Sequence, residues 1–247
     1  MHRLLCITAH PDDEAGGFGG TLALYAGRGV ETHVICLTPG QAASHRGDTR
    51  SEEELSERRR QEFAASCRVL NVKHGEVLSY RDGALDHADL YTVAADLARW
   101  IRRIKPHVVI TFGPEGALTA HTDHGMASIF ATCAFHWAGR SNRFAEQFSE
   151  GLESHRAQKL YYGTAGFTLP ERQPVSLPPS TAVIDISKHF EQKIQAFRAH
   201  TTQAPLLPIF EKNIAAGQQR ELFHLAAAVT PRQMQMETDL FEGIAEE

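Results

Sequence analysis

The chain has 247 residues, of which 42% are hydrophobic and 22% charged, an ordinary composition for a globular protein. Its 30 acidic residues outnumber 25 basic ones and give a net charge of −5, so it lacks the basic footprint of a nucleic-acid-binding protein. The sequence contains no apolar stretch of the length that spans a bilayer. We therefore expect neither a nucleic-acid partner nor a membrane span.

The four cysteines indicate the compartment. Cys6, Cys36, Cys67 and Cys133 are far apart in the sequence and form no C-x-x-C pair, which is typical of reduced thiols. The N-terminal apolar run is too short for a signal peptide and leads directly into charged residues. Both observations predict a cytoplasmic protein.

Strands and helices alternate through the first half of the chain. Apolar runs predict strands at residues 3–9, 30–38, 77–80 and 107–112. A first helix, with apolar positions at Phe18, Leu22, Leu24 and Tyr25, is expected to end near residues 27–29, and further helices are expected over 51–69 and 89–105. Ser51 followed by acidic residues is a good helix start, and this helix is expected to bury Leu55, Phe63, Ala64, Cys67 and Leu70.

The second half of the chain is less regular. His121 opens a predicted helix that ends near residue 137, and strands are expected at 159–163 and 181–186. Prolines mark a loop between these two strands, at positions 170, 174, 178 and 179. Residues 185–200 are predicted as the end of a strand followed by a helix, and residues 210–228 as a mixed segment.

The alternation of strands and helices predicts an α/β fold with a mostly parallel sheet and helices on both faces. No repeat or linker divides the chain, so we expect one domain over residues 1–247. In a parallel sheet the loops after the first and fourth strands meet at the same edge. This arrangement would bring together two groups of residues, which are His10, Asp12 and Asp13, and His121, Asp123 and His124.

The residue types in these two groups are suited to a metal. Two histidines and one carboxylate bind zinc and leave a fourth position for water, whose pKa falls to about 7 on the metal. Adjacent carboxylates such as Asp12 and Asp13 are costly to bury without a positive charge beside them. The remaining groups are sufficient for metal-assisted hydrolysis of an amide or an ester.

Two motifs carry a family resemblance. The sequence Ala-His-Pro-Asp-Asp-Glu at 9–14, followed by His-Thr-Asp-His at 121–124, resembles the LmbE-like or PIG-L family of zinc-dependent N-acetylglucosaminyl deacetylases. The resemblance extends to later positions, which are Arg59, Glu62, Asp82, Gly83, Lys193, Ala196, His200 and Gln203. It implies a Rossmann-like fold, in agreement with the predicted order of strands and helices.

The resemblance also implies roles for individual residues. It makes His10, Asp13 and His124 the ligands of one zinc ion per chain. It makes Asp12 the general base and His121 the group that stabilises the oxyanion or protonates the leaving amine, with Asp123 orienting the His121 ring. Weaker assignments to sugar contacts fall on Arg59, Asp82 and His200.

The implied reaction removes the acetyl group from an N-acetylated amino sugar or its conjugate and yields acetate and a free amine. A homo-oligomer is also expected from the resemblance. Each weaker site residue has a structural alternative, because Arg59 is also typical of a solvated helix face near Glu62, and Asp82 of a turn before Gly83.

Two other functions stay open at this point. A nucleotide-binding protein is suggested by the glycines at 16, 17, 19 and 20, although they lack the G-x-G-x-x-G spacing and follow acids that would repel a phosphate. A non-haem iron oxygenase is suggested because two histidines and one carboxylate also form the facial triad of that class. An oxygenase needs no adjacent base such as Asp12.

Overall fold

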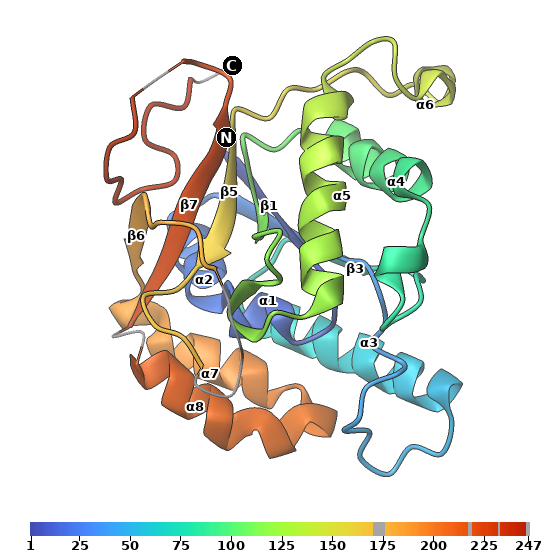
Figure 1. Cartoon of the computed structure of the whole chain (residues 1–247), viewed down its shortest axis with the longest axis vertical. Helices are drawn as coiled ribbons and strands as arrows, with labels where there is room; N and C mark the ends of the chain where they lie inside the picture. The colour runs from blue at the N-terminus through green and yellow to red at the C-terminus, as the bar shows by residue number, and fades with distance from the viewer. Residues whose placement is uncertain (170–175, 217–218, 232, 246–247) are drawn as a thin grey trace.

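Seven strands form one sheet, in the order β3-β2-β1-β4-β5-β7-β6, in a computed structural model that describes residues 1–169, 176–216, 219–231 and 233–245 (Figure 1). The strands are β1 Arg3–Thr8, β2 Glu31–Cys36, β3 His74–Val77, β4 Val108–Phe112, β5 Lys159–Thr164, β6 Ala182–Asp185 and β7 Arg220–Ala228. The helices of the described residues are α1 Asp13–Gly16, α2 Gly19–Gly27, α3 Glu52–Val69, α4 Leu90–Ile104, α5 Thr122–Ala138, α6 Ala145–Ser149, α7 Phe190–Arg198 and α8 Leu207–Ala216.

The sheet is mostly parallel, as predicted. Strand β1 pairs in parallel with β2 and β4, β2 with β3, and β4 with β5, whereas β7 is antiparallel to both β5 and β6. The strand order reverses between β1 and β4, because the chain first builds outward to β3 and then returns to the other side of β1. This reversal opens a crevice at the carboxyl ends of β1 and β4, which is where open α/β sheets bind ligands.

The helices pack in two groups around the sheet (Figure 1). Helix α4 packs on α5, and both contact β1, while α2 and α3 pack on α7, and α7 on α8. The α/β architecture inferred from the sequence is therefore confirmed. Among the described residues, none of the helices combines the length and apolarity needed to cross a membrane. All four cysteines are free, and three of them are buried.

Helix α3 confirms the predicted start and corrects its predicted buried face. The Ser51 hydroxyl accepts the N–H of Glu54 at 3.2 Å, as expected of a helix cap. Ala64 is exposed, so its predicted burial is wrong. Three polar residues, Arg59, Glu62 and Ser66, are buried on this helix instead. A search for apolar stripes misses them because their burial depends on polar partners in distant parts of the chain.

Strand β3 begins earlier than predicted. The strand is His74–Val77 rather than 77–80, and it pairs with β2 from His33 opposite His74 to Cys36 opposite Val77. It is an edge strand with polar residues, so it lacks the apolar run on which the prediction relied. Downstream of it, the backbone still bonds to β2, since Leu78 donates its N–H to Cys36.

The other predicted elements differ mainly at their ends. The first predicted helix is split into α1 and α2, and the mixed segment at 210–228 consists of α8 and β7. Two of the four prolines that mark the predicted loop, those at 170 and 174, lie outside the described residues. Strand β7 fills the space between β5 and β6, so the last part of the chain completes the sheet.

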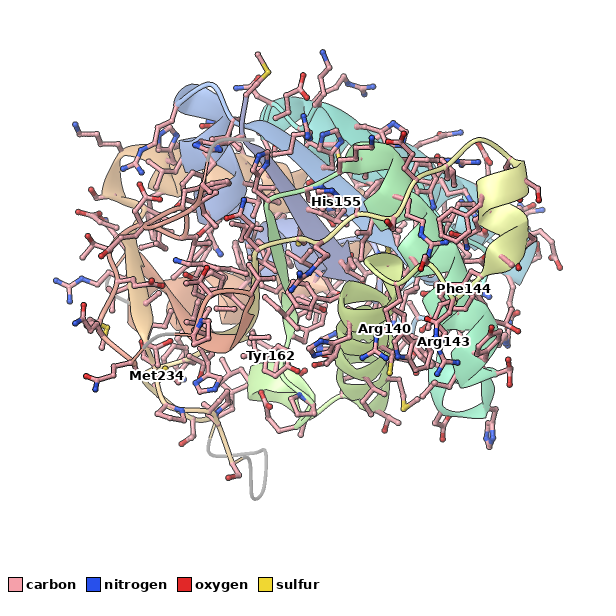
Figure 2. All side chains as sticks on the ribbon, turned by 90° about the horizontal axis from the view of Figure 1, so that it is seen from above. Arg140, Arg143, Phe144, His155, Tyr162 and Met234 are labelled. Atoms are coloured by element: carbon pink, nitrogen blue, oxygen red, sulfur yellow. The ribbon has the colours of Figure 1, made fainter. Side chains whose placement is uncertain are left out.

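Buried Arg102 joins α4 to the segment after α5. Its guanidinium donates to four backbone carbonyls and one side-chain oxygen, which belong to Ala138, Arg140, Arg143, Phe144 and Gln147. Figure 2 labels three residues of this segment, Arg140, Arg143 and Phe144, near the end of α5. A cation at a helix C-terminus satisfies carbonyl groups that the helix leaves unpaired.

Candidate metal centre

The structure brings the two predicted groups of residues together. The residues at 10–13 follow β1 directly, and His121 is the N-terminal cap of α5, which follows β4. Strands β1 and β4 are neighbours, so both groups lie at the crevice described above. Asp82 joins them from the loop after β3.

His10 is the centre of this cluster. Its Nε2 lies 3.1 Å from an oxygen of Asp82 and 3.2 Å from an oxygen of Asp123, and its Nδ1 lies 3.6 Å from Asp13. Burial lowers the pKa of His10, but hydrogen bonds to these three carboxylates outweigh burial and raise the pKa well above its usual value. Three buried carboxylates around one imidazole leave an excess of negative charge, which a divalent cation would neutralise.

Asp13 connects His10 to His124. One oxygen of Asp13 accepts the backbone N–H groups of Ala9 and His10, at 3.1 and 2.8 Å. The other oxygen lies 3.1 Å from Nε2 of His124. Burial raises the pKa of Asp13, but His124 and His10 outweigh it and hold the pKa well below its usual range.

The two motif histidines at the start of α5, His121 and His124, have different environments. The His124 ring is buried and stacks on Phe112, with ring centroids 4.1 Å apart, and its Nδ1 lies 3.3 Å from the Thr119 hydroxyl. His121 is exposed, and its ring centroid lies 4.9 Å from that of His10. Although the residue is exposed, desolvation of its ring lowers the pKa of His121, and the neighbouring His10 and His124 lower it further. The ring is therefore neutral near pH 7. A neutral imidazole both donates and accepts a hydrogen bond.

Asp123 contacts His121 through its backbone rather than through its carboxylate. The backbone N–H of Asp123 donates to Nδ1 of His121 at 3.1 Å. The Asp123 carboxylate contacts the His10 ring and accepts the N–H groups of Gly83 and Leu85, at 2.7 and 3.2 Å. The structure therefore places the backbone of Asp123, rather than its carboxylate, against His121, and the role of Asp123 in orienting that ring stays a prediction.

Asp12 lies beside the cluster and is partly open to solvent. Its side chain is 17% exposed, and one carboxylate oxygen lies 3.1 Å from a guanidinium nitrogen of Arg59. Burial raises the pKa of Asp12, Arg59 lowers it and Asp13 raises it, with a result of about 6. A carboxylate with this pKa is well matched to proton transfer near neutral pH.

The residues assigned to sugar contacts all lie at or under this site. Arg59 is 2% exposed and donates to the carbonyls of Gly40 and Pro11 as well as to Asp12, so the alternative of a solvated helix face is wrong. Asp82 both precedes the Gly83 turn and contacts His10. His200 is 1% exposed and bonds to Glu14. A sugar contact stays a prediction for these three residues. The contacts that the structure shows for them are with other parts of the protein.

Sequence reasoning gave no role to Glu14, which the structure places at the centre of a buried polar network. Its carboxylate contacts the backbone of Asp12, the Ser66 hydroxyl and the His200 ring. The available signal was its position as the third acid in a row directly after a buried strand, because such an acid must have buried partners.

Two overlapping sets of ligand atoms surround His10. One set contains His10, His121 and His124, the other contains His10, Asp82 and Asp123, and the atoms within each set lie within 4.8 Å of one another. Nitrogen and oxygen donors of this kind suit zinc. The residues present therefore fit a divalent metal.

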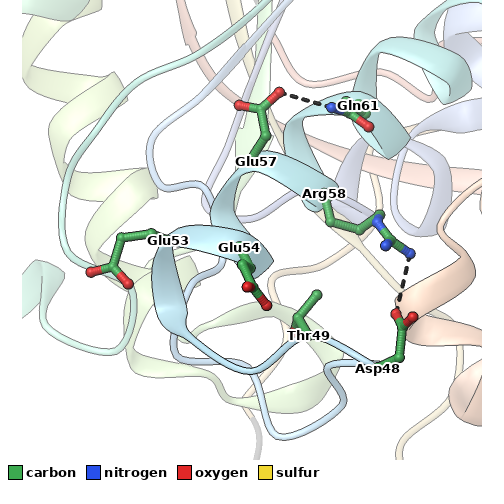
Figure 3. A pocket seen from close by; sticks show the side chains of 7 residues that line it. All are labelled: Asp48, Thr49, Glu53, Glu54, Glu57, Arg58 and Gln61. Carbon is green, nitrogen blue, oxygen red and sulfur yellow. Dashed lines mark hydrogen bonds and ion pairs between the residues drawn. The ribbon is translucent and has the colours of Figure 1, made fainter.

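A separate hollow of about 530 Å³ lies at the start of α3 (Figure 3). Its lining residues are Asp48, Thr49, Glu53, Glu54, Glu57, Arg58 and Gln61. Arg58 pairs with Asp48, and Gln61 bonds to Glu57 (Figure 3). The hollow shares no residue with the metal cluster, and its acids have no histidine among them, so it lacks the donor set of that site.

The chain is similar to proteins of one known family. The family model described as "PIG-L: GlcNAc-PI de-N-acetylase" matches residues 5–135, from β1 into α5. A 1D-myo-inositol 2-acetamido-2-deoxy-alpha-D-glucopyranoside deacetylase of Acidothermus cellulolyticus is 31% identical over 282 residues, which cover 99% of this chain and 96% of that protein.

Two solved structures are similar in fold. The N,N'-diacetylchitobiose deacetylase of Pyrococcus horikoshii superimposes with a TM-score of 0.75 and 26% identity, over 93% of this chain and 86% of that one. GalB, the 4-carboxy-2-hydroxymuconate hydratase of Pseudomonas putida, superimposes with a TM-score of 0.71 and 21% identity, over 94% and 99%. The second likeness shows the fold alone. With a family match over residues 5–135 and a relative 31% identical over nearly the whole length, the chain belongs to the PIG-L family of de-N-acetylases.

Proposed function

We propose that the chain is a zinc-dependent hydrolase that removes the acetyl group from an N-acetylglucosamine-type sugar or its conjugate. The observation that carries the proposal is the pairing of His10, Asp13 and His124 with a partly exposed carboxylate, Asp12, directly beside them. Two of the deacetylases similar to this chain are named for substrates that carry an N-acetylated amino sugar. Its four free cysteines fit a cytoplasmic location.

The ligands that we assign to one zinc ion are Nδ1 of His10, the oxygen of Asp13 that faces His124, and Nε2 of His124. A ligating histidine usually donates its other N–H to a polar acceptor such as a carboxylate, and this supports the assignment. The Nε2 of His10 faces Asp82 and Asp123, and Nδ1 of His124 faces a hydroxyl.

The competing set of His10, Asp82 and Asp123 is less favourable. Both oxygens of Asp123 already accept backbone N–H groups, and one oxygen of Asp82 accepts the N–H of Ala42 at 2.9 Å. Metal binding to Asp123 would compete with its two bonds, whereas the Asp82 oxygen that faces His10 is not the one that accepts Ala42. The two carboxylates are better placed to hold the His10 ring and to increase its basicity.

A bound zinc ion would supply a Lewis acid and a water with its pKa lowered to about 7. Asp12 accepts a proton from the attacking water, because its pKa of about 6 leaves it ionised at neutral pH and still basic enough to take the proton. His121 is exposed and neutral, and its Nδ1 is held by Asp123, so its other nitrogen is left to donate to the substrate oxygen or to the leaving amine.

The structure argues against the nucleotide-binding alternative. In such proteins the backbone N–H groups at the start of the glycine-rich helix bind phosphate. At the start of α2, the N–H groups of Gly20 and Thr21 are bound by the Glu221 carboxylate, at 2.9 and 2.8 Å. A phosphate would have to displace this buried carboxylate.

Asp12 distinguishes the hydrolase from an iron oxygenase. An oxygenase needs an open coordination position for oxygen but no carboxylate of suitable pKa beside it. The hydratase GalB shares the fold, so the fold by itself does not determine the reaction. The assignment therefore depends on the site residues.

An acetate-release screen over a panel of N-acetylglucosamine derivatives tests the proposal. The chain loaded with zinc should release acetate from at least one of them, and a chelator should abolish the release until zinc is restored. Oxygen uptake with the iron-loaded chain is measured in parallel. Turnover that requires oxygen, or no acetate from any derivative, would overturn the proposed function.

A further inference from the structure

Asp12 has a backbone conformation that residues other than glycine rarely adopt. Its φ is +117° and its ψ is −25°. A conformation of this kind costs about 1–3 kcal/mol and persists only where surrounding contacts impose it. The contacts that hold this residue therefore determine where its carboxylate lies relative to Asp13.

Glu14 supplies one of these contacts. Its Oε2 accepts the backbone N–H of Asp12 at 3.0 Å, and the whole residue is buried. The carbonyl of Asp12 accepts the N–H groups of Ala15 and Gly16, at 3.1 and 2.7 Å. The peptide groups on both sides of the strained residue are thus hydrogen-bonded. Arg59 donates a hydrogen bond to the carboxylate of Asp12 and so fixes its side chain as well.

Two distant residues hold Glu14. The Ser66 hydroxyl donates to Oε1 of Glu14 at 2.5 Å, and Nε2 of His200 lies 2.6 Å from the same oxygen. His200 is 186 positions away in the sequence and has no exposed side-chain surface. Its other ring nitrogen, Nδ1, has no hydrogen-bond partner among the residues that the structure describes. The contact with Glu14 is therefore the polar interaction that orients this ring.

We propose that Glu14 is a positioning residue for the proton acceptor Asp12, and that His200 and Ser66 hold Glu14 in place. This inference rests on the proposed function of Asp12. The two oxygens of Glu14 have separate tasks, since Oε2 receives the N–H of Asp12 and Oε1 receives Ser66 and His200. A carboxamide has one accepting oxygen and a donating nitrogen, so it satisfies only one of these tasks.

The first test is Glu14→Gln. We expect kcat for acetate release to fall about 10- to 100-fold, with KM and the zinc content within about twofold of the parent, because the base is displaced while the ligands and the substrate contacts remain. A crystal structure of this variant should show Asp12 with a negative φ, or with its carboxylate no longer hydrogen-bonded to Arg59.

A matched pair at His200 tests the other end of the network. His200→Gln keeps an N–H that donates to Glu14, whereas His200→Leu leaves the buried carboxylate without this donor. We expect His200→Leu to reproduce the loss of kcat and His200→Gln to restore most of it. Glu237→Gln is the control for the loss of a buried carboxylate, because Glu237 bonds to Lys159 and Tyr161. It should lower stability and leave kcat unchanged.

Several results would overturn the inference. One is a folded Glu14→Gln variant that contains zinc and keeps the parental kcat. Another is a structure of that variant in which Asp12 keeps both its positive φ and its contact with Arg59. If Glu14→Gln does not fold, equal kcat values for the two His200 variants would refute the inference. If the parent releases no acetate, the proposed function fails, while the conformation of Asp12 in the variant structure still tests the positioning.

Discussion

Asp12 contacts Arg59, whereas its neighbour Asp13 contacts the two proposed histidine ligands, so the two acids should respond differently to substitution. Asp12→Asn keeps the size of the side chain and removes the proton acceptor. We expect the variant to bind zinc like the parent and to lose about 10²- to 10⁴-fold in kcat. Zinc content and acetate release measured on the same sample check this, and a variant that retains parental turnover would exclude Asp12 as the base.

The choice between the proposed ligands, which are His10, Asp13 and His124, and the alternative set of His10, Asp82 and Asp123 also leads to a prediction for single residues. If His124 is a ligand and Asp82 supports His10, His124→Ala should abolish stoichiometric zinc binding, whereas Asp82→Asn should weaken it by about 10- to 100-fold. Competition with a zinc chelator gives both affinities. The reverse order of the two effects would instead assign the metal to His10, Asp82 and Asp123.

At the scale of single elements, Arg102 joins α4 to the segment that follows α5. It is 1% exposed and donates to four carbonyls in its surroundings. A lysine has three donors on a flexible stem and cannot reproduce the planar fork. We expect Arg102→Lys to lower the free energy of unfolding by about 2–4 kcal/mol in a urea titration, because carbonyls are left unpaired.

The adjacent residue supplies the control for this prediction. Arg103 is exposed, so Arg103→Lys should change the free energy of unfolding by less than about 0.5 kcal/mol. Equal stabilities of the two variants would show that the buried guanidinium contributes nothing specific.

Elements with a continuous apolar pattern were the ones that sequence reasoning located well. Strands β1 and β4 are mostly apolar and buried, and they appear within two residues of the predicted ends. The prediction places edge strand β3 three residues too late, at 77 instead of 74, and misses the buried polar face of α3, because hydrogen bonds rather than apolar burial stabilise them. Periodicity reports only the apolar part of burial.

The same distinction holds for the candidate site. The residues of the two motifs were expected together, because parallel strands place their following loops at one edge. The buried links to later parts of the chain were not expected, among them Glu14 with His200 and Glu221 with Lys193. Such pairs are more than a helix length apart in sequence or join different elements, and no local pattern connects them.

At the scale of the whole molecule, the last part of the chain supports the site although it contributes none of the proposed zinc ligands. The family match ends at residue 135, while His200 bonds to Glu14 beyond it, and Glu221 of β7 binds the start of α2. Lys193 of α7 bonds both to Glu221 and to the carbonyl of Gly16, two residues after the motif that carries Asp12. The conformation of the N-terminal loop therefore depends on the folding of the C-terminal third.

The stability of the whole molecule should depend on pH through His33. This residue is 8% exposed, and neither of its ring nitrogens has a hydrogen-bond partner among the described residues. Burial lowers the pKa of His33 to about 4, whereas the unfolded chain has a value of about 6.5. Between these values the unfolded state binds more protons, so the free energy of unfolding falls as the pH is lowered from 6.5 toward 4.

His33→Leu removes this proton uptake and two buried nitrogens that lack partners. We expect the parent to lose about 1 kcal/mol more than His33→Leu between pH 7 and pH 5, after allowance for screening by water at this sheet. Urea titrations at both pH values measure the difference, with exposed His87→Gln as the control that keeps the parental dependence. If parent and His33→Leu lose the same free energy over this interval, His33 is already protonated in the folded state or accessible to water, and its burial does not limit stability in acid.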